Sequence, residues 1–232
     1  MAAGIERILV PGWDVASSEA ALGLAERHAP LVQGAVGLHP HYAAAADEGT
    51  WRELEGLLGD PRCSAAGEIG LDFFRNLSPP DVQRAAFERQ LGIAAALGLP
   101  VLVHDRDAHD EVTSALIRWP ERRASGAARG VLHAFSGDAA MAATLTGRGF
   151  LVSFALPVSF ISAVGPRSAA AAIPAESYLV ETDAPYLGPN RNGRNEPTTT
   201  LRVAAELARL RGMEPQAVAD DARRAYERLI AT

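Results

Sequence analysis

The sequence contains no lysine, since all 22 of its basic residues are arginine. Lysine is the side chain that forms Schiff bases and that titrates readily enough to serve as a buried base. A carbamylated lysine can also bridge two metal ions. The absence of lysine therefore excludes a lysine Schiff base, a lysine general base and a carbamylated-lysine metal bridge.

Cysteine and long apolar runs are also scarce. A single cysteine, Cys63, excludes a disulfide framework and a thiolate zinc cluster, and we expect it to be a small buried hydrophobe. The longest apolar run, residues 91–103, contains two glycines and a proline and predicts no membrane span. Glu6 and Arg7 stand where a signal peptide would be apolar. We therefore expect a cytoplasmic protein without membrane association.

Basic residues are outnumbered by 28 acidic ones, which gives a formal net charge of −6. A general nucleic-acid coat protein carries a basic surface, so this charge weighs against that class. It is compatible with an enzyme that binds phosphates through metal ions and a few arginines.

Short apolar runs alternate with helical patterns along the chain, which predicts an α/β fold with a parallel sheet covered by helices. We expect strands at residues 5–10, 31–38, 63–71, 100–104, 130–135, 150–154 and 177–181. Helical spacing of apolar residues predicts helices at 17–28, 47–58, 79–97, 108–119, 139–148, 198–211 and 215–230, with Ser78 as the N-cap of the third. Without internal repeats or a low-complexity linker, residues 1–232 are expected to form one domain, a TIM-type (β/α) barrel.

Histidine and carboxylate residues stand at the carboxyl ends of five predicted strands. In a parallel barrel these ends converge on one face. Because ionisable side chains are costly to bury singly, the pattern predicts a shared partner, most simply a metal centre. Imidazoles with carboxylates suit Zn, Mn or Fe better than Ca. The residues at these ends are His39 and His41, Glu68 and Asp72, His104 and Arg106, His133, and Glu181 and Asp183.

Structural interpretations of the same residues stay open. His104 and His133 are also compatible with hydrogen-bonded core histidines, and Asp72 with the cap of a turn. Glu68 is harder to explain structurally, because the glycines around it permit close backbone approach.

Two loops with polar side chains have more than one interpretation. His39 and His41 fit a capping or loop role as well as contact with a substrate. Ser136 suggests a nucleophile, but its surroundings lack the small residues of a nucleophile elbow, and no His–Asp pair is assigned to it.

Six motifs, in order along the chain, carry a family resemblance: GLHPH, GEIGLD, LVHDRDAHDE, LHAFSGD, ETDAPYL and RNEP. They resemble the TatD-type metal-dependent deoxyribonucleases of the amidohydrolase-like barrel superfamily, from about Gly4 to the C-terminus. The resemblance implies a nuclease that cleaves DNA phosphodiesters with water activated by metal. It also implies two divalent ions (Mg, Mn or Zn), or one in this chain.

The resemblance assigns metal and catalytic roles to four residues. Glu68 resembles the bridging carboxylate, and His104 and His133 match the ligands of the second metal. Asp183 matches the aspartate that is both ligand and base for the attacking water. Glu68 and Asp183 are therefore the candidate catalytic residues.

Other residues would meet the DNA substrate. Arg106 and the loop of His39 would face it, and the loop with Arg191, Arg194 and Asn195 would approach its phosphates, for which arginine has the right geometry. A solvated loop is the alternative for these arginines. No obligate protein partner is expected.

One family motif is not found. The family begins with a strand that ends in Asp-x-His-x-His, whereas this sequence opens on residues that resemble the family's second strand. Seven strands are countable where a closed barrel needs eight. A late start site, a natural truncation with weaker or single-metal chemistry, and a relative kept for binding all fit this difference. A hydrolase of small esters or amides at the same site is the further alternative.

Overall fold

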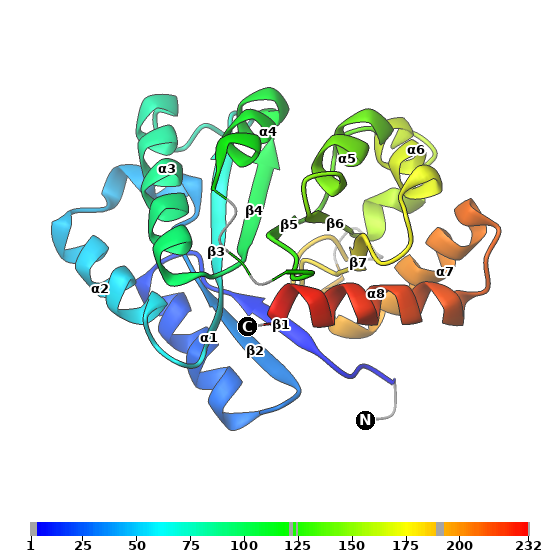
Figure 1. Cartoon of the computed structure of the whole chain (residues 1–232), viewed down its shortest axis with the longest axis horizontal. Coiled ribbons are helices and arrows are strands. Elements are labelled where there is room, and N and C mark those ends of the chain that lie inside the picture. Colours follow the sequence, from blue (N-terminus) through cyan, green and yellow to red (C-terminus); the bar gives the residue numbers. More distant parts are fainter. Residues whose placement is uncertain (1–3, 121–122, 124, 189–192, 232) are drawn as a thin grey trace. The chain divides into compact units, whose positions relative to one another are not determined.

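The structure is a computed structural model that describes residues 4–120, 123, 125–188 and 193–231. The chain forms two compact units, here called the amino-terminal unit (Glu6–Ser125) and the carboxy-terminal unit (Gly126–Ala231, joined by residues 4–5). The described residues contain seven strands that alternate with helices (Figure 1), and every strand pairing described within a unit is parallel. The α/β prediction is therefore confirmed.

Four strands of the amino-terminal unit pair side by side in chain order. They are β1 (Ile8–Pro11), β2 (Val32–Val36), β3 (Cys63–Asp72) and β4 (Val101–Arg106). The connections run through α1 (Val15–Arg27), the 3-10 turn η1 (Pro40–Ala45), α2 (Glu48–Leu58) and α3 (Pro80–Leu97), and α4 (His109–Arg118) follows β4. Helix α1 packs on β1 and β2, α2 on β2 and β3, α3 on β3, and α4 on β4. The core between strands and helices includes Leu22, Leu54, Ile69, Phe87 and Leu116, all fully buried.

Helix starts in this unit follow from local capping, with one departure from the sequence prediction. Asp14 accepts the N–H of Ser17 at the start of α1. At α3 the cap is Pro79, without a side-chain cap bond, so the predicted Ser78 cap is wrong. The buried Ser78 hydroxyl instead donates to the carbonyl of His41 and accepts the N–H of Ala44. Ser78 thereby ties the start of α3 to η1.

The carboxy-terminal unit contains three parallel strands in chain order. They are β5 (Gly130–Leu132), β6 (Phe150–Phe154) and β7 (Tyr178–Val180). Its helices are α5 (Ala139–Thr146), α6 (Val164–Ala172), α7 (Thr200–Arg211) and α8 (Pro215–Ile230), with 3-10 turns η2 (Leu156–Ser159) and η3 (Pro197–Thr199). Helix α6 was not predicted, because Gly165 and Pro166 interrupt its pattern. Proline is tolerated there since it lies in the first turn.

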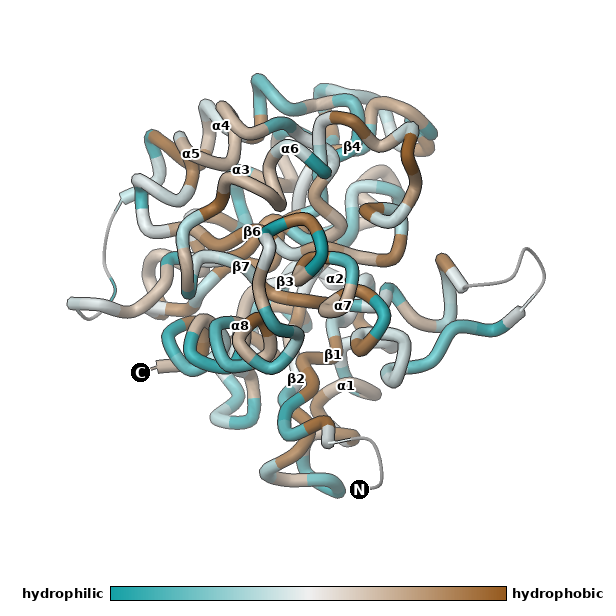
Figure 2. The backbone as a smooth tube through the Cα atoms, turned by 90° about the vertical axis from the view of Figure 1, so that its right-hand side faces the viewer, coloured by the Kyte–Doolittle hydropathy of each residue, from teal (hydrophilic) through white to brown (hydrophobic). Residues whose placement is uncertain are grey.

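Helix α8 shows how the outer helices are anchored. Its polar and apolar residues alternate around the helix (Figure 2), and its buried positions include Val218, Ala222, Ala225 and Leu229. It packs on β7, where the Tyr178 hydroxyl meets the buried Asp221 carboxylate at 3.1 Å. Within the described part of the chain, no helix combines the length and the apolar character needed to cross a membrane.

Glycines bring β3 and β4 unusually close together. A Cβ on Gly67 would lie 2.5 Å from the Cβ of Leu102 in β4. Gly70 has a φ of +144°, and a Cβ there would collide with the carbonyl oxygen of His104. The sequence-based reasoning that glycines around Glu68 serve close backbone approach is confirmed.

This close approach predicts opposite effects for two glycine-to-alanine substitutions. Gly70→Ala should lower the free energy of unfolding by about 2 kcal/mol or more, because it adds a clash to an unfavourable φ. Gly56→Ala, in the last turn of α2 with open space around its Cα, should raise it by up to about 1 kcal/mol. Urea unfolding followed by circular dichroism measures both. Equal stability of Gly70→Ala and the wild type would contradict the close approach.

Candidate metal centre

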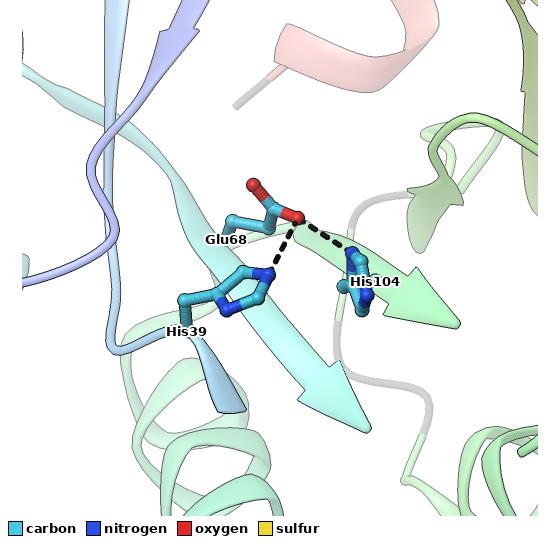
Figure 3. Close-up of side chains that lie close together, drawn as sticks. All are labelled: His39, Glu68 and His104. Carbon is cyan, nitrogen blue, oxygen red and sulfur yellow. Dashed lines mark hydrogen bonds and ion pairs between the residues drawn. The ribbon is translucent and has the colours of Figure 1, made fainter. Parts of the chain in front are cut away.

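Three side chains of the amino-terminal unit converge at the carboxyl ends of neighbouring strands. His39 follows β2, Glu68 projects from β3 and His104 from β4 (Figure 3). Oε1 of Glu68 lies 2.9 Å from Nδ1 of His104 and 3.4 Å from Nε2 of His39. One possible ligand atom from each residue lies within 4.8 Å of the other two. These three residues form the Glu68 cluster, the one group of potential metal ligands found among the described residues.

Asp72 fixes the orientation of His104 from the other side of the ring. Its Oδ2 lies 3.2 Å from Nε2 of His104 and 2.7 Å from Nε2 of His41, while Oδ1 accepts the N–H of Arg75 at 2.7 Å. Burial raises the pKa of Asp72, but the hydrogen bonds from His104, Arg75 and His41 outweigh it and lower the pKa well below its ordinary value. An ionised carboxylate only accepts hydrogen bonds, so the ring nitrogens that face it carry protons.

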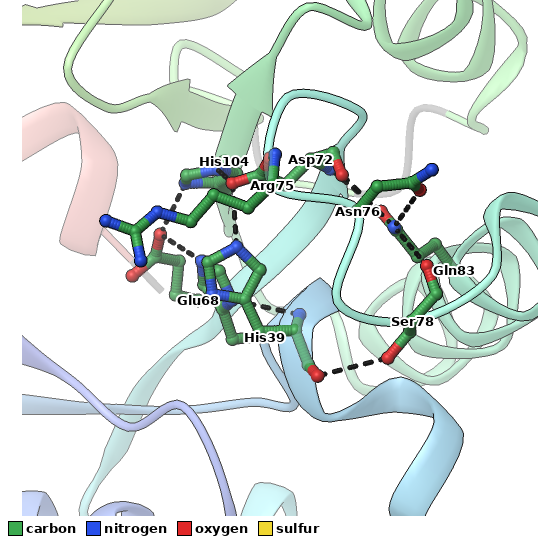
Figure 4. A network of polar contacts seen from close by, with 9 residues as sticks. His39, Glu68, Asp72, Arg75, Asn76, Ser78, Gln83 and His104 are labelled. Atoms are coloured by element: carbon green, nitrogen blue, oxygen red, sulfur yellow. Dashed lines mark hydrogen bonds and ion pairs between the residues drawn. The ribbon is translucent and has the colours of Figure 1, made fainter.

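The backbone of Asp72 is also held in place (Figure 4). Its N–H donates to the side-chain carbonyl of Gln83, whose amide group donates back to the carbonyl of Asp72 and to that of Ser78. Gln83 lies in α3 and is almost fully buried. Helix α3 and the end of β3 therefore set the position of the carboxylate that orients His104.

The protonation of His104 indicates what the Glu68 cluster can hold. With its proton on Nε2 facing Asp72, the neutral ring presents a lone pair at Nδ1, 2.9 Å from an oxygen of Glu68. Two acceptors at this distance repel each other unless a proton or a metal ion is shared between them. A carboxylate that fixes the far nitrogen of a histidine is the usual outer partner of a histidine metal ligand. The donor set therefore fits a divalent ion held by Glu68 and by Nδ1 of His104.

His39 has a different role in the cluster. Its Nδ1 accepts the N–H of His41 at 3.2 Å, so the neutral ring carries its proton on Nε2. Burial lowers the pKa of His39 and so favours this neutral form. The Glu68 carboxylate acts in the opposite direction, but its effect is smaller. Nε2 then donates to Glu68 and has no lone pair for a metal. We therefore assign His39 as a hydrogen-bond donor at the edge of the centre.

The other two predicted ligands, His133 and Asp183, lie in the carboxy-terminal unit. His133 follows β5, and its Nδ1 lies 3.5 Å from Oε1 of Glu181. Glu181 is fixed in turn by the N–H of Ala134 and the hydroxyl of Ser153. Asp183 follows β7 with a φ of +56°. The roles of His133 and Asp183 as metal ligands stay predictions.

The predicted substrate-binding residues have unequal environments. The exposed Arg106 lies at the end of β4, with its guanidinium 4.7 Å from the ring centre of Phe74. Asn195 is buried, and its amide group donates to the carbonyls of Thr182, Tyr186 and Leu187. Asn195 therefore shapes the loop after β7.

Two arginines complete the predicted substrate set. Arg194 is exposed in the loop after β7, and Arg191 lies outside the described residues. The roles of Arg106, Arg191, Arg194 and Asn195 toward DNA stay predictions.

Asp72, the main supporting residue of the site, is not among the predicted metal ligands, catalytic residues or substrate contacts. Asp72 was weighed as a turn cap, which it is, through the N–H of Arg75. Its second role, holding His41 and His104, depends on register, because Gly70 is opposite His104 and Asp72 opposite Arg106. The sequence segments HPH (39–41) and GLD (70–72) indicate the contacts of Asp72 with the two histidines only once β2, β3 and β4 are known to be neighbours.

Fold and site together define a metal-dependent hydrolase, and comparison with known proteins identifies the family. The family model described as TatD related DNase matches residues 1–231. The chain therefore belongs to this family, which confirms the resemblance seen in its motifs. It is a metal-dependent hydrolase of the TatD family.

Similar proteins agree with this assignment. The 3'-5' ssDNA/RNA exonuclease TatD of Enterobacter lignolyticus is 37% identical over 222 residues, covering 93% of this chain and 84% of the relative. The uncharacterized metal-dependent hydrolase TatD of Mycobacterium tuberculosis is 38% identical over 237 residues, covering 97% and 87%. The crystal structure of YJJV, a TatD homolog from Escherichia coli, superposes with a TM-score of 0.88 at 30% identity, over 98% of this chain and 87% of that one. The TIM-type fold is thereby confirmed.

The arrangement around His104 predicts that Asp72→Asn weakens metal binding about 10-fold to 100-fold, since the amide cannot fix the proton on Nε2. Isothermal titration with Mn²⁺ measures this affinity. Asp60→Asn is the matched control, because Asp60 lies before the start of β3 and Asp72 lies at its end. Asp60 pairs with Arg62 on the surface. Unchanged Mn²⁺ affinity in Asp72→Asn would show that this carboxylate does not position the ligand.

Proposed function

We propose that this chain is a metal-dependent nuclease that hydrolyses the phosphodiester bonds of single-stranded DNA. The observation that carries the proposal is the Glu68–His104 pair, with the Nε2 proton of His104 held by the buried Asp72. Family membership and the exonuclease names of relatives such as the Enterobacter lignolyticus protein support the choice of substrate. The native ion is proposed to be Mg, Mn or Zn, with one or two ions in the site.

A divalent ion bound there would polarise the phosphodiester and make a water molecule acidic enough to attack it. The residues of the chain supply the rest. Glu68 and His104 fix the point at which the reaction takes place, and Asp72 keeps the ring of His104 from turning. Nε2–H of His39, which faces Glu68, would stabilise the negative charge of that carboxylate at the edge of the cluster.

Two further roles in the proposed reaction come from the family motifs. Asp183 would orient the attacking water and accept its proton. Arg106, exposed two residues beyond His104, would neutralise a phosphate next to the one that is cleaved. The role of Arg106 depends on the substrate being a chain of phosphodiesters, which a small ester or amide does not offer.

Glu68→Gln should lower the Mn²⁺-dependent cleavage of end-labelled single-stranded DNA by more than about 100-fold, the upper end for a residue outside the ligand shell. Asp183→Asn should also remove most of the activity, and a chelator should abolish it in the wild type. Glu53→Gln, an exposed glutamate of α2, is the matched control and should retain full activity.

Three results would contradict the proposal. Activity retained in Glu68→Gln would remove the cluster from the reaction. Hydrolysis of small esters or amides with no cleavage of DNA would favour the alternative substrate class. Mn²⁺ binding without hydrolysis of any substrate would favour a binding role.

A further inference from the structure

Three large aromatic side chains of the amino-terminal unit are exposed to solvent. The exposed fractions are 46% for Trp13, 44% for Tyr42 and 62% for Phe74. The other two tryptophans of the chain, Trp51 and Trp119, are only 8% and 7% exposed. Aromatic side chains usually pack in the core, so three exposed ones in one unit indicate a surface that binds another molecule.

All three follow the carboxyl ends of strands in the amino-terminal unit, the same ends at which the Glu68 cluster lies. Trp13 follows β1, and its carbonyl accepts the N–H of His39 at 3.0 Å. The ring of Tyr42, in η1 after β2, meets the His39 ring edge-on with 6.5 Å between centres. Phe74 follows β3, two residues beyond Asp72. We call Trp13, Tyr42 and Phe74 the aromatic rim.

Positive charge lies beside the aromatic rim. The Arg106 guanidinium covers the Phe74 ring at 4.7 Å, and Arg106 pairs in register with Asp72. Arg75, the neighbour of Phe74 in the sequence, is also exposed. Flat apolar rings next to arginines match the two surfaces of a single-stranded nucleic acid, which presents unpaired bases and a phosphate chain.

We propose that the aromatic rim stacks unpaired bases of a single-stranded nucleic acid and leads its backbone to the Glu68 cluster, with Arg75 and Arg106 on the phosphates. The proposal rests on the proposed nuclease function and adds to it a means of selecting the substrate. Bases of a duplex are already stacked on each other, so the aromatic rim favours single strands. Stacking is tolerant of sequence, because every base has a π-face.

Trp13 provides a built-in probe, because it is the exposed tryptophan of the three. A short oligothymidylate, added to the full chain without divalent metal so that no cleavage occurs, should quench tryptophan fluorescence. An abasic oligodeoxynucleotide of the same length, with the same phosphates, should bind at least tenfold more weakly and quench little. Equal binding of the two oligonucleotides would overturn the proposal.

Substitutions separate stacking from folding. Trp13→Ala and Phe74→Ala should each weaken oligothymidylate binding about tenfold by fluorescence anisotropy of a labelled oligonucleotide. Trp13→Phe should restore most of the affinity because it keeps an aromatic ring. Leu97→Ala is the matched control, since Leu97 is exposed to a similar degree but lies at the other end of the strands. It is the last residue of α3, shortly before the amino end of β4. Unchanged affinity in Trp13→Ala and Phe74→Ala would overturn the proposal.

The same variants distinguish this proposal from the nuclease function. If both hold, Trp13→Ala raises the KM for single-stranded DNA while the rate on an abasic oligonucleotide stays at the wild-type level. Cleavage of DNA with an unaltered KM in the variants would overturn the base-stacking role of the aromatic rim and leave the nuclease function standing. Loss of self-association in the variants, with unchanged oligonucleotide binding, would assign the surface to a second copy of the chain and also overturn it.

Discussion

The backbones of β3 and β4 approach each other more closely than side chains would allow at Gly67 and Gly70. The register of the two strands is irregular there, shifting between Ala66 and Ile69 and then placing Gly70 opposite His104. This approach brings Glu68 and His104 together from neighbouring strands, so that their polar atoms lie 2.9 Å apart. The geometry of the centre in this unit is therefore set by the backbone, and the side chains need little freedom to reach it.

Asp72 converts that backbone geometry into a defined chemical state. Its carboxylate stays ionised despite burial because two imidazoles and a backbone N–H donate to it. The charge fixes the His104 proton on Nε2 and leaves Nδ1 open toward Glu68. Similar logic applies to His39, where the backbone N–H of His41 fixes the same tautomer, with the proton on Nε2, but this ring turns its N–H and not a lone pair toward Glu68. Of the two histidines in contact with Glu68, His104 thus presents a lone pair to the carboxylate and His39 presents an N–H.

Periodicity predicted the strands and most helices, since each element carries its own apolar pattern. Helix α6 was missed because Gly165 and Pro166 obscure that pattern. Position at strand ends also placed Glu68 and His104 in one predicted metal site, together with His133 and Asp183. The role of Asp72 and the different ring nitrogens that His39 and His104 turn toward Glu68 were not predictable, because they depend on hydrogen bonds between residues 31 to 36 positions apart or on loop geometry. Ser78 was misassigned for the same reason: its partners lie in η1, far away in sequence.

We propose that Glu68 and Nδ1 of His104 hold a divalent ion while Asp72 holds the far nitrogen of the ring. Anomalous diffraction from crystals grown with Mn²⁺ tests it most directly, because it locates the ion without any assay of activity. We expect an anomalous peak in contact with the Glu68 carboxylate and with Nδ1 of His104, and none on Nε2 of His39. A peak on Nε2 of His39 or on the Asp72 carboxylate, or no peak at Glu68 at all, would contradict it.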